Sequence, residues 1–89
     1  MELEGKAAIV TGGAVRLGRA MALELARHGV RLAIHYASSS GPAQGVVGAI
    51  KAMGGDAMAI QADLSRPSTA PSIVERAVAR FGQVDILVN

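Results

Sequence analysis

Short apolar runs alternate along the chain with longer stretches in which apolar residues recur at helical spacing. The apolar runs lie at 6–11, 30–36, 54–62 and 84–89, and the helical stretches at 17–28, roughly 43–53 and 68–81. The runs are apolar at successive positions rather than at every second one, which is typical of strands covered on both faces. Alternation of strand and helix favours a parallel sheet with right-handed crossover connections. The predicted fold class is therefore α/β.

Two of the helical stretches show an apolar face. In 17–28 this stripe consists of Leu17, Ala20, Met21 and Leu25. In 68–81 the apolar positions are Ile73, Val74, Ala77, Val78 and Phe81. Gly29 and Gly82 follow the two stretches, where a left-handed glycine commonly ends a helix. We expect these faces to pack on the sheet.

The stretch 43–53 is a weaker helix. Gly45 and Gly48 lie inside it, and each costs about 1 kcal/mol relative to alanine in a helix interior. We expect the two glycines to permit close backbone packing. The other interpretation is a segment that frays in isolation.

Charge and composition exclude several classes of protein. The formal net charge is +2, the charged fraction is 18%, and no block of like charges occurs, so neither a nucleic-acid partner nor a membrane partner is expected. The basic residues Arg16, Arg19, Arg27 and Arg31 fall in one stretch that contains a single acid, Glu24. Such a local excess suits one small anion better than a polymer.

The chain offers little for a metal or a disulfide. It has no cysteine and only two histidines, His28 and His35, so we expect no metal site and a structural role for both histidines. The first residues carry acids where a signal peptide needs cations, and no apolar run approaches the roughly 18 residues of a membrane span. We expect a cytoplasmic protein.

The candidate chemistry lies in the loops. In parallel sheets of this kind, ligands bind beyond the carboxyl ends of the strands, where the strand order reverses. That edge is predicted to carry "TGGAVRLG" (11–18), "HYASSS" (35–40), "QADLS" (61–65) and Asn89. A dinucleotide needs a glycine turn for its pyrophosphate, a group that contacts its ribose and a wall for its adenine, and these loops offer a candidate for each.

In these motifs the chain resembles the N-terminal part of a short-chain dehydrogenase/reductase. The resemblance rests on "TGGAVRLG" after the first strand, "ADLS" after the third and "VDILVN" on the fourth. It implies the first βαβαβαβ portion of a Rossmann-type doubly wound parallel sheet, with strand order 3-2-1-4. It also implies that residues 1–89 are the N-terminal part of a single NAD(P)-binding domain, truncated before the catalytic segment.

The glycine motif departs from the family at one position. The family pattern Thr-Gly-x-x-x-Gly-x-Gly places glycine at 12, 16 and 18, but this chain has Arg16. Gly12 would allow the tight turn, and Gly18 the close approach of helix and strand. Pteridine reductases share the arginine variant, in which that arginine is associated with NADPH. We expect Arg16 to contact a cofactor phosphate; the alternative is a solvated side chain.

The resemblance also indicates the cofactor. NAD-preferring enzymes place a carboxylate after the second strand, whereas this chain has Tyr36, Ala37, Ser38 and Ser39. Serine hydroxyls can donate to a 2′-phosphate, and Arg16 can supply a charge-assisted bond to it, so NADP(H) is expected, with NAD(H) possible. The alternative for the serines is an ordinary loop with a helix cap. Asp63 resembles the family aspartate that binds the adenine amino group, with Leu64 beside the ring; it could instead be a turn residue.

The expected cofactor-binding residues are therefore spread over all four loops. They are Gly12, Arg16, Leu17, Gly18, Tyr36, Ser38, Ser39, Asp63, Leu64 and Asn89. Asn89 resembles the first asparagine of the family motif on the fourth strand, which steadies the sheet and the cofactor crevice.

Catalytic residues of the family are not found in the chain. The family's Tyr-x-x-x-Lys is absent, since the one tyrosine, Tyr36, is followed at position 40 by Ser40. We expect the parent to be an NADP(H)-dependent oxidoreductase that reduces a small carbonyl, 3-oxoacyl, enoyl or pterin substrate, and these residues alone to be inactive. The competing interpretation is a non-catalytic nucleotide-binding module that acts through a partner protein. Because 84–89 leaves an unpaired apolar edge, we expect the isolated 89 residues to form a homo-oligomer, to aggregate or to be only partly ordered.

Overall fold

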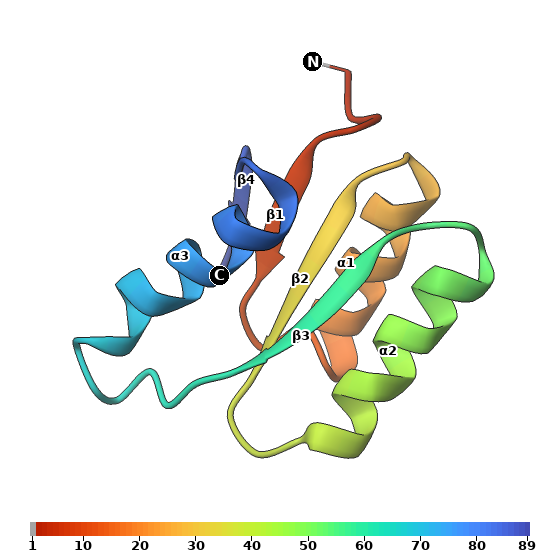
Figure 1. Ribbon diagram of the computed structural model, residues 1–89. Coiled ribbons are helices and arrows are strands. Elements are labelled where there is room, and N and C mark those ends of the chain that lie inside the picture. Colours follow the sequence, from red (N-terminus) through yellow and green to blue (C-terminus); the bar gives the residue numbers. More distant parts are fainter. Residues whose placement is uncertain (1) are drawn as a thin grey trace.

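In the computed structural model, which describes residues 2–89, strands and helices alternate as the apolar pattern predicts (Figure 1). The strands are β1 (Ala7–Val10), β2 (Arg31–Tyr36), β3 (Ala57–Gln61) and β4 (Ile86–Val88), and the helices are α1 (Arg16–Arg27), α2 (Ser40–Ala52) and α3 (Thr69–Phe81). All paired strands are parallel, in the order β3-β2-β1-β4. The expected 3-2-1-4 order is confirmed.

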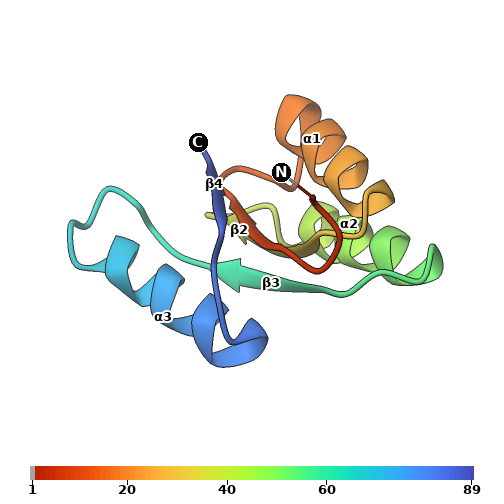
Figure 2. The same cartoon turned by 90° about the horizontal axis from the view of Figure 1, so that it is seen from above.

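Helices cover both faces of the sheet. Figure 2 shows α1 and α2 on one side and α3 on the other. Successive residues of β1 lie alternately in the two hydrophobic cores. Ala8 and Val10 pack with α1 and α2, whereas Ala7 and Ile9 pack with α3. This two-sided burial explains why the strand sequences are apolar at successive positions.

The predicted apolar faces of α1 and α3 are partly wrong. In α1 the buried residues are Ala22 and Ala26, while Leu17 is 72% exposed. The remaining members of the predicted stripe divide as follows: Leu25 is half-buried, and Ala20 and Met21 are exposed. In α3, Val74 and Val78 are exposed, whereas Ile73, Ala77 and Phe81 are buried. Each helix therefore has more apolar surface than the sheet of these residues covers.

The second helix begins earlier than predicted. It starts at Ser40 rather than near 43, and Pro42 is tolerated because the first turn of a helix leaves backbone N–H groups without an intrahelical partner anyway. A Cβ atom built on Gly45 or Gly48 would meet nothing within 4 Å, and both residues are exposed. The expectation that these glycines permit close packing is therefore wrong.

We predict that Gly45→Ala and Gly48→Ala each raise the free energy of unfolding by about 1 kcal/mol, because alanine costs less backbone entropy in a helix and meets no neighbour at either position. Denaturant unfolding followed by circular dichroism measures the change. Gly18→Ala is the matched control, since its Cβ would lie 2.9 Å from the carbonyl carbon of Gly12, and it should destabilise the protein. A neutral or negative effect at both helical glycines would contradict the prediction.

Candidate functional site

The carboxyl ends of the strands meet at one edge of the sheet. In Figure 1 the turn after β1, the loop between β2 and α2, and the loop after β3 all lie along the same lower edge of the sheet. The chain crosses from β1 to β2 and β3 on one side of β1, and β4 pairs on the other. The strand order therefore reverses beside β1, which places the glycine turn at the switch point where α/β sheets bind ligands.

Two glycines shape the turn between β1 and α1. Gly12 has φ +62°, a left-handed conformation that glycine adopts without steric cost. Gly18 packs against the backbone of the same turn, where a Cβ would lie 2.9 Å from the carbonyl carbon of Gly12 and 3.0 Å from Cα of Gly13. The tight turn and the close approach of the helix are both present as expected.

The amides of this segment fall into two groups. The protein itself uses the first three: Thr11 N–H donates to the Val88 carbonyl (2.9 Å), Gly12 N–H to His35 Nδ1 (3.2 Å) and Gly13 N–H to the His35 carbonyl (3.1 Å). These amides hold the turn in place. The N–H groups that can face a ligand are therefore further along, at the start of α1.

Helix α1 begins without a cap. Its N-cap residue, Val15, makes no side-chain capping bond, and no acidic residue lies in the first turn. Within residues 2–89, the amides of Arg16, Leu17 and Gly18 have no hydrogen-bond partner. Unpaired N–H groups and the positive end of the helix dipole together favour an anion at such a terminus.

Arg16 adopts a left-handed backbone conformation, which glycine reaches without steric cost. Its φ is +53°, and among residues 2–89 it is the only non-glycine residue with positive φ. The left-handed region costs an L-residue roughly 1–2 kcal/mol, and such strain gathers at functional sites. The side chain is exposed and makes no hydrogen bond or ion pair within the described part of the chain. Its guanidinium is therefore available beside the uncapped helix.

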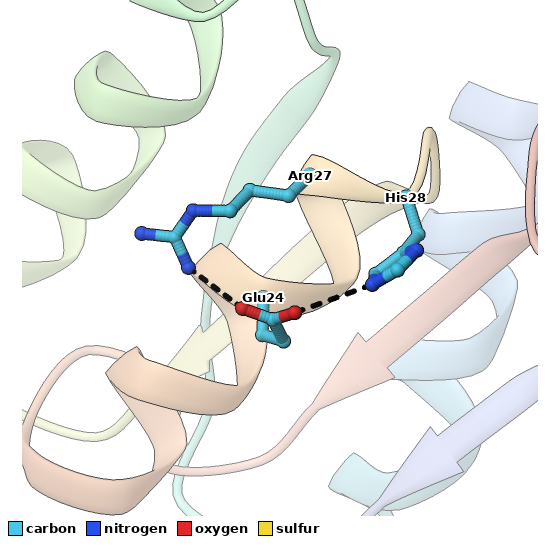
Figure 3. A network of polar contacts seen from close by, with 3 residues as sticks. All are labelled: Glu24, Arg27 and His28. Carbon is cyan, nitrogen blue, oxygen red and sulfur yellow. Dashed lines mark hydrogen bonds and ion pairs between the residues drawn. The ribbon is translucent and has the colours of Figure 1, made fainter.

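Two other arginines of the basic stretch, Arg27 and Arg31, lie away from Arg16. Arg31 lies at the opposite edge, where it donates to the carbonyls of Phe81 and Gly5 (both 2.9 Å). Figure 3 shows Arg27 and His28 at the far end of α1, where both contact Glu24, at 2.8 and 3.2 Å. The bond from Arg27, and then that from His28, lowers the pKa of Glu24. A single anion site shared by all four arginines of this stretch is thus excluded.

The loop after β2 has free hydroxyl groups. Tyr36 is half-buried and its carbonyl accepts a hydrogen bond from Ala62 N–H (3.1 Å). Ser39 occupies the N-cap position of α2, but its hydroxyl makes no capping bond, and the first turn contains no acid. Ser38 is exposed. Ser39 thus occupies the position of a helix cap, which is the alternative role for this loop, but its hydroxyl makes no capping hydrogen bond.

Asp63 forms the turn after β3. Its Oδ1 accepts hydrogen bonds from the Ser65 hydroxyl (2.6 Å) and the Ser65 N–H (3.0 Å), and these bonds lower the pKa of the Asp63 carboxyl. The Thr69 hydroxyl donates to the Asp63 carbonyl (2.8 Å). Asp63 therefore does act as a turn residue. Its second carboxylate oxygen, Oδ2, has no partner within residues 2–89. Leu64, next to it, is exposed.

Asn89 lies beside the start of the glycine turn. Its Oδ1 is 3.4 Å from the Thr11 hydroxyl, which also donates to the Val88 carbonyl (3.1 Å). The structure thus places all the expected site residues at one edge of the sheet, on four separate segments.

Sequence reasoning gave His35 only a structural role. The structure shows it 5% exposed in β2, with one ring nitrogen on Gly12 N–H and the other 3.0 Å from the Ala62 carbonyl. A histidine within an otherwise apolar run, just before the loop that carries candidate chemistry, is the signal that points to it.

The family model of short chain dehydrogenases matches residues 6–89. The chain belongs to this family. Its sequence is 47% identical over 87 residues to L-rhamnose 1-dehydrogenase (NAD(P)(+)) of Sphingomonas sp. strain SKA58, covering 98% of this chain and 34% of that protein. It is 47% identical over 89 residues to a hydroxynaphthalene reductase of Aspergillus fumigatus, covering 100% and 33%.

A solved structure shows the same fold. A short chain dehydrogenase from Burkholderia cenocepacia, in complex with NADP, superposes with a TM-score of 0.95 at 46% identity, covering 100% of this chain and 36% of that one. This short-chain dehydrogenase chain thus spans about a third of the length of the relatives it matches.

Two further properties bear on the site. Within residues 2–89 no helix has the length and apolar character that crossing a membrane requires. The same residues contain no cluster of three or more side chains suited to holding a metal ion.

We predict that Arg16→Gly raises the free energy of unfolding by about 0.5–1 kcal/mol, because relief of the left-handed strain exceeds the entropy cost of an added glycine. Thermal or denaturant unfolding measures the change. Arg19→Gly is the control, since Arg19 is exposed in the same helix without positive φ, and there glycine should destabilise by about 1 kcal/mol. Equal losses in both variants would show that Arg16 is unstrained.

Proposed function

We propose that these residues form the cofactor-binding part of an NADP(H)-dependent oxidoreductase of the short-chain dehydrogenase/reductase type. The observation that carries the proposal is the uncapped start of α1 beside the strained Arg16, whose side chain has no partner within residues 2–89. Both features favour a negatively charged ligand, and both lie at the switch point of the sheet.

In this proposal the cofactor phosphates bind at the start of α1. The amides of Arg16, Leu17 and Gly18 donate to the pyrophosphate, and Gly12 allows the backbone to turn away beneath it. The Arg16 guanidinium adds a permanent charge for the ribose 2′-phosphate, whose oxygens match its fork of N–H groups. The positive φ of Arg16 supports this assignment because the strained backbone places a cation beside the open amides of the helix.

The preference for NADP(H) rests on the loop after β2. No carboxylate follows Tyr36, and the hydroxyls of Ser38 and Ser39 are available to a ribose 2′-phosphate. A carboxylate there would repel the phosphate. The NADP complex of the Burkholderia relative and the NAD(P)(+) of the rhamnose dehydrogenase support this class of cofactor. Binding of NAD(H) is weaker in this proposal, not excluded.

The adenine binds at the loop after β3. Asp63 has one carboxylate oxygen engaged by Ser65 and the other unpaired within residues 2–89, so it can accept from the adenine amino group. The exposed Leu64 offers an apolar contact for the ring. Asn89 steadies the opposite side of the crevice through Thr11.

The reaction that fits this cofactor is hydride transfer to or from a small molecule. Nicotinamide supplies the hydride, and a proton donor must serve the substrate oxygen. The matched relatives are named as a sugar dehydrogenase and a hydroxynaphthalene reductase, which supports a carbonyl or hydroxyl substrate. The arginine in the glycine motif keeps pterin reduction among the candidates, with carbonyl and 3-oxoacyl reduction.

The proton donor is not among these residues. Tyr36 lies at the end of β2 on the cofactor side and has Ser40 four positions on. Because the chain spans about a third of its relatives, we propose that it belongs to a longer single domain and that residues 1–89 alone do not catalyse. A non-catalytic nucleotide-binding module is not favoured, since the matched relatives are named as dehydrogenases and reductases.

We propose that β4 is an interior strand of a larger sheet in that protein, and that the 89 residues on their own self-associate. One edge of β4 pairs with β1, the other has no strand within residues 2–89, and Leu87 is 57% exposed. An unpaired apolar edge invites pairing with another chain.

Light scattering of the 89-residue chain should therefore show species larger than a monomer, and Leu87→Lys should shift them toward monomer because lysine on an edge strand opposes pairing. Met53→Lys changes an exposed apolar residue at the end of α2 and should leave the distribution unchanged. A monodisperse wild-type monomer with a cooperative melt would contradict the prediction.

In the complete protein, Arg16→Ala should weaken NADPH binding by about 1–3 kcal/mol, the scale of a charged hydrogen bond, while barely changing NADH binding. Titration of each cofactor, followed by nicotinamide fluorescence, measures both dissociation constants. Arg19→Ala is the control, since Arg19 is a nearby exposed arginine of the same helix. Equal losses for NADPH and NADH would show that Arg16 does not contact the extra phosphate.

A further inference from the structure

His35 connects two of the loops at the carboxyl edge through its ring. Its Nδ1 is 3.2 Å from Gly12 N, and its Nε2 is 3.0 Å from the Ala62 carbonyl oxygen. His35 is 5% exposed, and it is the only polar or charged residue within residues 2–89 that is buried. A buried polar ring with both nitrogens engaged fixes the separation of its two partners.

The partners determine where the ring proton lies. Gly12 N–H is a donor, so Nδ1 must accept with its lone pair, and the Ala62 carbonyl is an acceptor, so Nε2 must carry the hydrogen. Only the neutral form protonated at Nε2 satisfies both contacts. The His35 ring therefore accepts a hydrogen bond from one loop and donates one to the other, in addition to filling space between them.

Each partner lies next to a candidate ligand contact. Gly12 begins the turn that leads to the open amides of α1, and Gly13 N–H also donates to the His35 carbonyl. Ala62 directly precedes Asp63, and its N–H donates to the Tyr36 carbonyl. One residue of β2 thus sets the position of the glycine turn on one side and of the Asp63 loop on the other.

We propose that His35 is a positioning residue that holds the pyrophosphate turn and the adenine loop at the spacing of one dinucleotide. The proposal rests on the proposed function, because the two loops need a fixed separation only if one ligand spans them. The ring does not touch the ligand; it acts through Gly12 on one half and through Ala62 on the other.

Two amide variants separate the two contacts. The Asn Oδ1 takes the place of Nδ1, so His35→Asn keeps the acceptor for Gly12 and loses the donor to Ala62. The Gln Nε2 takes the place of the ring Nε2, so His35→Gln keeps the donor to Ala62 and loses the acceptor for Gly12. Each variant thus removes one half of the link.

The dissociation constants of NADP⁺ and adenosine in the complete protein read out the two halves, since adenosine has neither the pyrophosphate nor the 2′-phosphate. His35→Gln should weaken NADP⁺ about tenfold, the cost of an unpaired N–H, and change adenosine binding by less than about twofold. His35→Asn should weaken both ligands by the same factor, about fivefold, because the adenine loop serves both. His35→Leu, which leaves neither group, should combine the losses.

A general loosening of the fold would weaken both ligands equally in both amide variants, and this result would overturn the proposal. Unchanged affinities in both variants would overturn it as well. Wild-type protein that binds neither ligand would instead contradict the proposed function itself. Should the variants not fold, ¹⁵N NMR of the wild-type ring decides: an unprotonated Nδ1 and a protected Nε2–H support the proposal, and a proton on Nδ1 overturns it.

Discussion

The contact between the first turn of α1 and the backbone of the turn after β1 is the constraint on which the site depends. Gly18 lies so close to the carbonyl of Gly12 that no side chain fits between them. Because the helix starts against the end of β1, its N-terminus opens at the edge of the sheet where the strand order reverses. Moving the helix outward by the width of a methyl group would separate its open amides from the crevice.

The same contact explains how the loop divides its hydrogen-bonding groups. The amides of residues 11–13 bond to β4 and to His35, which anchors the turn to strands on both sides of β1. The amides of residues 16–18 have no partner within residues 2–89, and no acid or capping side chain neutralises the end of the helix. Rigid anchoring beside open donors is the arrangement that binds an anion with little reorganisation.

The strands and the turn residues of the candidate site could be predicted from sequence because they follow from local signals, whereas the strand order followed from the resemblance to short-chain dehydrogenases. The apolar runs are buried on both faces, and Gly12 and Gly18 have the backbone roles that their spacing indicates. Helix faces could not be predicted as well. An apolar stripe indicates only that its residues can be buried. Leu17 and Val78 are exposed because no other part of residues 2–89 packs against them. The bridging role of His35 depends on contacts between residues 23 and 27 positions apart, which no local pattern encodes.

The conformation of Arg16 argues most directly for an anionic ligand. A left-handed arginine costs roughly 1–2 kcal/mol relative to the right-handed conformation, and glycine would remove that cost at the same position. No contact of its side chain within residues 2–89 offsets the strain. A solvated Arg16 side chain would thus leave the backbone strain without compensation. A charge-assisted bond to phosphate contributes about 1.5–3 kcal/mol, which is enough to offset the strain when the ligand binds. The comparison of strain energy with hydrogen-bond energy therefore favours a cofactor contact for Arg16 over a side chain that the turn merely tolerates.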